Sequence, residues 1–104
     1  MINLLKQNKE QIELLCKKHK VVQCNVFGSA LSDTTFNPQK SDIDFAVIFD
    51  FKIPVVEMAD YYFNFIEDLE ELLKKPVDVV TLSSLKNKIF KKELEETMIS
   101  LYAA

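Results

Sequence analysis

The sequence predicts an α/β (α+β) fold, with a small mixed sheet of three to four strands flanked by helices, in a single domain over residues 1–104. Residues 43–49 are nearly continuous in apolar side chains beyond Asp44, as in a strand that is covered on both faces. Residues 55–75 repeat apolar side chains at helical spacing, and Pro76 ends the pattern. With 48% hydrophobic and 28% charged residues, the chain has a globular composition and the size for one modest core.

The elements are expected in the order helix, strand, loop, strand, helix, strand, helix. Gly28 ends the first strand, and Asn37-Pro38 marks the polar segment after it as a loop. Ser83 or Ser84 is a suitable cap for the last helix, because a serine hydroxyl can accept from a free N–H group of the first turn. The expected ranges are helix 2–20, strand 21–27, loop 29–40, strand 43–49, helix 55–75, strand 77–82 and a final helix to about Tyr102.

Charge and cysteine content limit the partners and the compartment. A formal net charge of −3 and a pI of about 5.1 leave no broad basic surface, so direct nucleic-acid binding is not expected. No apolar run approaches the ~20 residues of a membrane-spanning helix, and charges come too early for a signal peptide. Cys16 and Cys24 have no further ligands at zinc spacing, and buried free thiols are favoured over a disulfide between them. A cytoplasmic protein without membrane contact is expected.

Two carboxylates open the second strand, in Ser41-Asp42-Ile43-Asp44. Residues i and i+2 of a strand point to the same side, so Asp42 and Asp44 share one face while Ile43 points to the other. Like charges this close are poorly tolerated beside an apolar strand unless a cation neutralises them, and carboxylate oxygens suit Mg²⁺ or Mn²⁺. The alternative is a solvated turn in which Ser41 or Asp42 caps the loop.

A third carboxylate, Asp78, is the only charge in the apolar strand expected over 77–82. Taken alone, it could be an edge-strand residue that faces water. If its strand lies beside the second one, Asp78 joins Asp42 and Asp44 on one face, and three acidic side chains can hold two metal ions roughly 3.5–4 Å apart. One ion would orient a triphosphate, and the other would lower the pKa of an acceptor hydroxyl whose proton Asp78 could accept.

The only glycine of the chain stands in Val26-Phe27-Gly28-Ser29. Glycine lets the backbone approach a phosphate closely, the Ser29 hydroxyl adds a donor, and a helical turn after them would offer free N–H groups. Gly-Ser alone usually marks a turn. Gly-Ser after an apolar strand, with Ser-Asp-Ile-Asp opening the next strand, is more specific and indicates nucleotide chemistry.

With these motifs nearly the whole chain resembles the minimal nucleotidyltransferases of the DNA-polymerase-beta-like superfamily, among them the MntA-like antitoxins of HEPN/MNT toxin–antitoxin pairs. The resemblance implies the polymerase-beta-like fold and transfer of a nucleoside monophosphate from a nucleoside triphosphate, with ATP as the expected donor, to a hydroxyl. In the toxin–antitoxin branch the acceptor is a tyrosine of the toxin, which is silenced by AMP. By position, the resemblance assigns nucleotide binding to Gly28, Ser29 and Ser41, and catalysis with two Mg²⁺ (or Mn²⁺) ions to Asp42, Asp44 and Asp78.

One segment departs from the family pattern. After Gly-Ser the family usually continues with a residue, Ala, Arg and Gly, whereas Ala30-Leu31-Ser32-Asp33 lacks both the arginine and the second glycine. Loss of a guanidinium that binds phosphate costs on the order of 1.5–3 kcal/mol, and Asp33 adds a negative charge. Lys40, in the same loop, is a candidate to compensate. Weak or altered nucleotide binding is the expectation for this loop.

Two functions therefore compete. The first is a metal-dependent nucleotidyltransferase that acts as antitoxin on a small helical HEPN-type partner, in a homo- or hetero-oligomer, because no segment remains to bind a small-molecule acceptor as the extra domains of aminoglycoside-modifying relatives do. The alternative is a catalytically weakened member that neutralises its partner by docking alone. Sugar-nucleotide transfer through the Asp-x-Asp pair is disfavoured, because the chain is short for such a fold.

The other conspicuous side chains are expected to be structural. His19 ends the first helix, where a histidine interacts favourably with the helix dipole. Among the aromatic residues of the long helix, a core explains Tyr62 and Phe65. Tyr61 or Phe63 is then left for an apolar docking surface.

Overall fold

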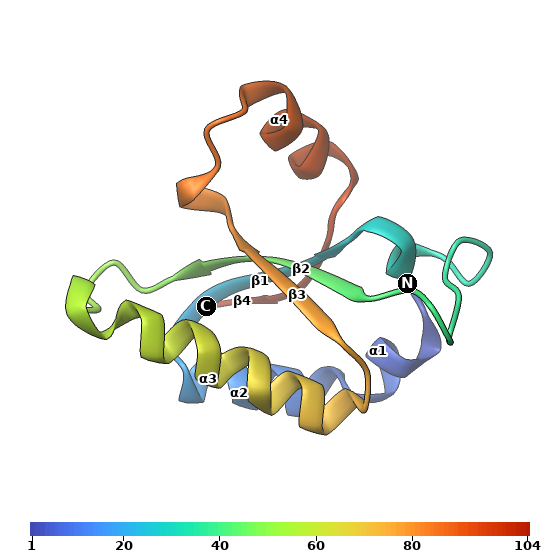
Figure 1. The fold of residues 1–104 in the computed structure, drawn as a ribbon, viewed down its shortest axis with the longest axis horizontal. Coiled ribbons are helices and arrows are strands. Elements are labelled where there is room, and N and C mark those ends of the chain that lie inside the picture. Colours follow the sequence, from blue (N-terminus) through green and yellow to red (C-terminus); the bar gives the residue numbers. More distant parts are fainter.

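The computed structural model describes residues 1–104 as a four-stranded sheet with helices on both of its faces (Figure 1). The strand order is β3-β2-β1-β4; β1 is antiparallel to β2 and β4, and β2 is parallel to β3. The predicted fold class is therefore confirmed. The helices are α1 (Asn3–Gln7), α2 (Lys9–Lys18), α3 (Val55–Leu73) and α4 (Lys88–Thr97), the strands are β1 (Val21–Phe27), β2 (Ile43–Phe49), β3 (Val77–Thr81) and β4 (Ile99–Ala103), and the 3₁₀ turns are η1 (Gly28–Leu31) and η2 (Leu82–Ser84).

One side of the sheet, which we call the core face, packs against α2 and α3. A cluster of 19 buried residues fills this space, with Ile12 from α2 and Phe65 from α3 fully buried in it. Phe45 and Val47 of β2 belong to the same cluster. Because strand residues alternate between the two faces, Ala46 between them points to the other side. Most of the buried apolar surface therefore lies on the core face.

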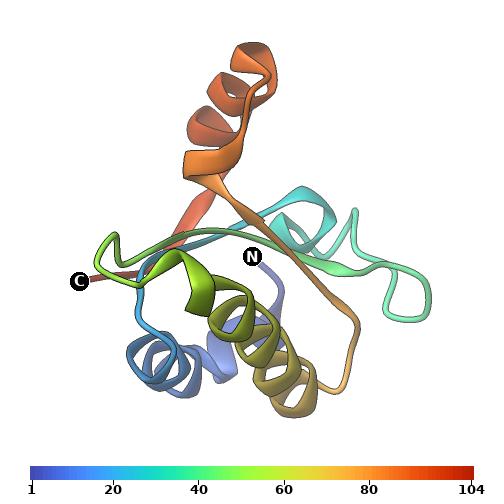
Figure 2. The ribbon, with the colours of Figure 1, turned by 60° about the vertical axis from the view of Figure 1, so that its left-hand side comes forward.

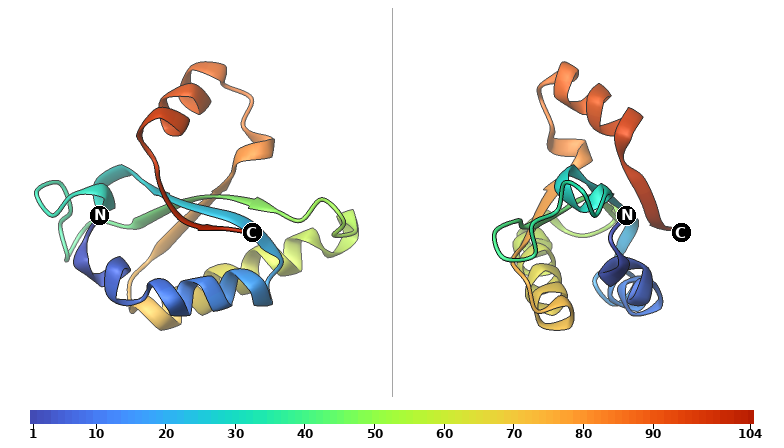
Figure 3. Two further views of the ribbon diagram at one scale, coloured as in Figure 1. Left: turned by 180° about the vertical axis from the view of Figure 1, so that it is seen from behind. Right: turned by 90° about the vertical axis from the view of Figure 1, so that its right-hand side faces the viewer.

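The opposite side, which we call the α4 face, has a thinner cover. Figures 2 and 3 show α4 on the far side of the sheet from α2 and α3. Leu94 is the one buried residue of α4, and it packs with Ala46 and Leu82 in a separate cluster of three. Asn25, a polar residue of β1, is also buried on this side of the sheet. Its Nδ2 donates to the Ala46 carbonyl at 3.1 Å. The α4 face therefore accommodates polar side chains as well as apolar ones.

A polar contact fastens α2 to α3 on the core face. The Asp68 carboxylate of α3 accepts from His19 Nε2 at 2.7 Å and from Lys18 Nζ at 2.9 Å. These hydrogen bonds, that of Lys18 foremost, lower the pKa of Asp68 below its ordinary value. His19, expected only to favour the helix dipole, is buried and has a specific partner.

The predicted final helix to Tyr102 is wrong. α4 ends at Thr97, and Ile99–Ala103 forms β4, which pairs antiparallel with β1. The pairing satisfies backbone groups of β4 that face β1 and buries Leu101 in the main core, so tertiary contacts outweigh local helix propensity.

Two further boundaries differ from expectation. The predicted first helix is divided at Asn8 into α1 and α2. The cap of α4 is Asn87, not Ser83 or Ser84: its Oδ1 accepts from the amides of the next turn at 3.0 and 3.1 Å. The serines instead fall in η2, which delays the start of the helix.

The two cysteines agree with the prediction. Cys16 of α2 and Cys24 of β1 are buried free thiols. A hydrogen bond with the Cys16 side chain, together with burial, raises the pKa of Cys24 well above its ordinary value. Both thiols therefore belong to the core.

Candidate active site

The second and third predicted carboxylates lie side by side on the α4 face. Parallel pairing of β2 with β3 sets Asp44 directly opposite Asp78. Both point away from the core face, because their neighbours Ile43 and Val77 belong to the main core cluster. β3 therefore lies beside β2, which is the arrangement under which Asp78 is expected to join Asp44 on one face.

Asp42 immediately precedes β2 and is exposed, as is Asp78, whereas Asp44 is half-buried between them. Burial raises the pKa of Asp44, and the negative charges of Asp78 and Asp42 raise it further. The charges of Asp78 and Asp42 therefore both act on Asp44. A bound cation would relieve the repulsion and favour the ionised form of Asp44.

The donor set fits a magnesium or manganese ion that is shared with a substrate. Carboxylate oxygens are the ligands such ions prefer, and Mg²⁺ usually completes its shell with water and substrate phosphates. No group of three or more histidine, cysteine, aspartate or glutamate side chains converges closely enough to hold a metal ion by itself. An ion at Asp42, Asp44 and Asp78 therefore needs further oxygen ligands, which a triphosphate can supply.

Gly28, the first residue of η1, contacts the site directly after β1 ends. Its φ of +74° lies in the left-handed region, and a Cβ on this residue would stand 2.6 Å from Asp44 Oδ2. A larger side chain would therefore displace the Asp44 carboxylate as well as strain the backbone. The sequence indicated only that the backbone must be approached closely here; in the structure the positive φ favours glycine, and the Asp44 carboxylate lies where a Cβ would stand.

Gly28 and the three residues after it form the short helical turn η1, in which Ala30 is buried. The Ser29 carbonyl accepts from Thr35 Oγ1 at 2.8 Å, so the turn is tied to the loop that follows. Ser41 closes that loop, because its Oγ accepts from the Asn37 amide at 3.0 Å. Ser41 therefore has a structural role in addition to the nucleotide-binding role predicted for it.

The segment that departs from the family pattern does not contribute a cation. Ser32, where the arginine is expected, binds Thr34 Oγ1 through its hydroxyl at 2.8 Å. Asp33 lines a separate pocket with Phe36 and Lys75, and the side chain of Lys40 is exposed. A phosphate group bound on this side would therefore have no cationic side chain from Ala30–Asp33 as a partner.

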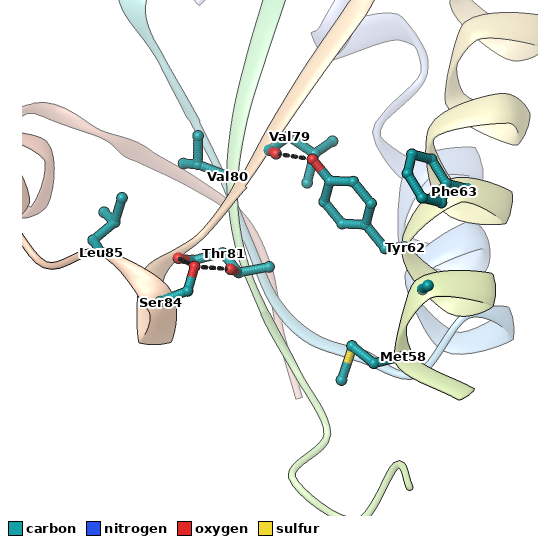
Figure 4. A pocket seen from close by; sticks show the side chains of 9 residues that line it. Met58, Tyr62, Phe63, Val79, Val80, Thr81, Ser84 and Leu85 are labelled. Atoms are coloured by element: carbon teal, nitrogen blue, oxygen red, sulfur yellow. Dashed lines mark hydrogen bonds between the residues drawn. The ribbon is translucent and has the colours of Figure 1, made fainter. Parts of the chain in front are cut away.

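An apolar pocket of about 470 Å³ lies beside β3 (Figure 4). Its walls come from α3, through Met58, Tyr62 and Phe63, and from the segment of Val79 to Leu85. Tyr62 donates its hydroxyl to the Val79 carbonyl at 2.6 Å, and its pKa is raised by burial and by the charge of Asp78. Helical spacing assigned Tyr62 to the core, and it gave no sign of this polar contact.

Comparison with known proteins defines the family. The model of the family described as "Polymerase beta, Nucleotidyltransferase" matches residues 9–104. The chain belongs to this family. It is 35% identical over 100 residues to "Putative protein adenylyltransferase MJ0128" of Methanocaldococcus jannaschii, covering 93% of this chain and 90% of that protein.

Solved structures give the same result. The protein described as a "putative minimal nucleotidyltransferase" superposes with a TM-score of 0.74 at 25% identity, over 94% of this chain and 95% of the other. A tri-AMPylated HEPN toxin of Shewanella oneidensis in complex with an MNT antitoxin gives a TM-score of 0.65 at 21% identity, over 95% of this chain and 72% of the other, which shows a shared fold. The predicted resemblance to minimal nucleotidyltransferases is confirmed, and so is nucleotidyl transfer as the general reaction. None of the helices of this chain is both long enough and apolar enough to cross a lipid bilayer.

Proposed function

We propose that this chain transfers AMP from ATP to a hydroxyl group of a partner protein. The observation that carries the proposal is the register of β2 and β3, which sets Asp44 opposite Asp78 with Asp42 one residue before the strand. The effect of the Asp78 and Asp42 charges on Asp44 supports the proposal, and so does the close approach of Gly28. Membership of the nucleotidyltransferase family supplies the general reaction.

In this proposal, some side chains bind the nucleotide and the cations, and one also accepts a proton. Gly28, Ser29 and Ser41 would bind the triphosphate, and Asp42, Asp44 and Asp78 would hold two divalent cations together with it. When bound, the cations neutralise the triphosphate and lower the pKa of the acceptor hydroxyl. The hydroxyl oxygen bonds to the α-phosphorus of ATP, the bond from that phosphorus to pyrophosphate breaks, and Asp78 accepts the hydroxyl proton.

The acceptor we propose is a tyrosine of a small helical HEPN-type protein. Two relatives support this assignment: one is named a putative protein adenylyltransferase, and the other is an MNT antitoxin in complex with an AMPylated HEPN toxin.

A second function is favoured by one observation. The segment Ala30–Asp33 has no cation, and its Ser32 hydroxyl is engaged within the loop. A member with weak triphosphate binding could still neutralise its partner by docking. In that case the fold would persist as a binding subunit without transfer.

The test uses purified protein, Mg²⁺, ATP labelled in the α-phosphate, and a purified candidate HEPN-type partner protein. Label is expected on the partner with the wild type. Asp42→Ala and Asp44→Ala are expected to abolish labelling without lowering thermal stability, whereas Asp60→Asn, which removes an exposed carboxylate of α3, retains it. A wild type that binds and silences the partner without labelling it would refute transfer and favour the docking function.

A further variant tests the segment Ala30–Asp33, which lacks the arginine of the family pattern. Ser32→Arg restores a guanidinium where the family pattern has one. ATP affinity is expected to rise by about tenfold or more, as for a new charge-assisted contact to phosphate. No change in ATP affinity would show that this loop is not the weak point of the nucleotide site.

A further inference from the structure

One of the three carboxylates stands on an edge strand. β3 pairs only with β2, so the backbone groups on its other side have no strand partner. Its neighbour in the register, Asp44, carries like charge, and Asp78 contributes to the raised pKa of Asp44. An edge strand that bears such a charge needs other contacts to stay in place.

Two side chains of α3 supply contacts of this kind on either side of Asp78. The Val77 amide donates to Glu70 Oε2 at 3.0 Å, and the Tyr62 hydroxyl donates to the Val79 carbonyl at 2.6 Å. Figure 4 shows the Tyr62 ring reaching from α3 to β3 along this bond. The residues immediately before and after Asp78 are therefore both bound to the same helix.

We propose that Tyr62 and Glu70 are positioning residues that hold Asp78 in register with Asp44; this inference rests on the proposed function. Val77 and Val79 are buried on the core face while Asp78 emerges on the α4 face. Fixing the backbone at both neighbours fixes the Cα position of Asp78 and the direction of its side chain. The two contacts oppose the charge repulsion between the strands.

The alternative is that the same contacts only satisfy the free backbone groups of an edge strand. This role would stabilise the fold without affecting Asp78. The variants Tyr62→Phe and Glu70→Ala each remove one contact and keep the residue's place in α3. Glu70→Gln retains an oxygen acceptor and is the conservative rescue. Tyr61→Phe is the matched control, because Tyr61 lies under Lys20 and does not line the pocket beside β3.

The first measurement does not depend on activity. The NMR order parameter of the Asp78 backbone amide is expected near 0.85 in the wild type, in Tyr61→Phe and in Glu70→Gln, as for rigid backbone. It is expected to fall in Tyr62→Phe and in Glu70→Ala. Unchanged values in both of these variants would overturn the positioning role.

The second measurement separates positioning from stability. In Tyr62→Phe and Glu70→Ala, kcat for AMP transfer is expected to fall about tenfold, as when a reacting group is misplaced by a fraction of an ångström. The KM for ATP is expected to stay within about twofold, because Gly28 and Ser29 are untouched. Unchanged kcat with a lower Tm would assign the contacts to edge protection alone. A wild type without transfer activity would refute the proposed function, while the order parameters would still decide the inference.

Discussion

The two faces of the sheet differ in what their side chains contribute. On the core face, α2 and α3 enclose a cluster of 19 buried residues. On the α4 face, a cluster of three is buried, and Asp44 and Asp78 stand beside each other. Alternate side chains of β2 point to opposite faces of the sheet. Phe45 is fully buried in the core, whereas Asp44 before it is half-buried in the candidate site. The difference indicates that the core face supplies stability and that the α4 face can carry charges that cost stability.

The largest expected effect tests the core face. Phe65→Ala removes a fully buried aromatic side chain that packs edge-on against Phe49. We expect the free energy of unfolding to fall by about 3–5 kcal/mol, from lost burial and the cavity left behind. Urea denaturation of the two proteins measures the loss.

The matched control for this variant lies two residues earlier on the same helix. Phe63 is 62% exposed, so Phe63→Ala is expected to change the free energy of unfolding by less than about 1 kcal/mol. Similar losses in Phe63→Ala and Phe65→Ala would contradict the assignment of stability to the core face.

A smaller effect is expected at the border of the α4 face. Gly28→Ala places a methyl group 2.6 Å from Asp44 Oδ2 at a φ of +74°. The strain is expected to lower the free energy of unfolding by about 1–3 kcal/mol and to displace the Asp44 carboxylate. Urea denaturation measures the first effect, and the labelling assay measures the second.

A double variant separates the two causes. In an Asp44→Ala background the carboxylate is absent, so only the backbone strain of Gly28→Ala remains. We expect the two substitutions together to cost less than their sum, by roughly 0.5–3 kcal/mol, as for residues in contact. Strict additivity would show that the close approach of Gly28 to Asp44 has no energetic consequence.

Local patterns were sufficient to predict most of the fold and the composition of the site. The apolar runs defined β2 and β3, and the isolated carboxylates within them defined the candidate site. Adjacency of the two strands was the condition left open, and the register of Asp44 with Asp78 satisfies it. These features could be predicted because strand periodicity and charge placement are properties of short segments.

Long-range contacts account for what the sequence could not reveal. β4 is a strand because its residues pair with β1 about 75 residues earlier, as in the pair Asn25 and Ser100. The contact of Gly28 with Asp44 depends on the β1–β2 register, and that of Tyr62 with Val79 depends on the placement of α3 over an edge strand. An aromatic residue at helical spacing indicates burial, but the partner of its hydroxyl is set by tertiary structure.

The smallest expected effect is a contrast in pH dependence between the two faces. The folded-state pKa of Asp44 is raised, so the folded protein binds more protons there than the unfolded chain, and its contribution to stability is lost as pH rises through the folded pKa. The folded-state pKa of Asp68 is lowered, so its contribution is present above the unfolded pKa and is lost as pH falls through the folded pKa. The two carboxylates therefore act in opposite directions.

Asparagine variants isolate each contribution. Relative to the wild type, Asp44→Asn is expected to gain stability as pH rises from about 3 to about 6, and Asp68→Asn is expected to lose stability over the same range. Each change should stay below about 1 kcal/mol, because solvent screens both groups. Urea denaturation at several pH values measures both slopes. Slopes of the same sign would contradict the contrast, whereas added Mg²⁺ that reduces only the gain of Asp44→Asn would locate cation binding on the α4 face.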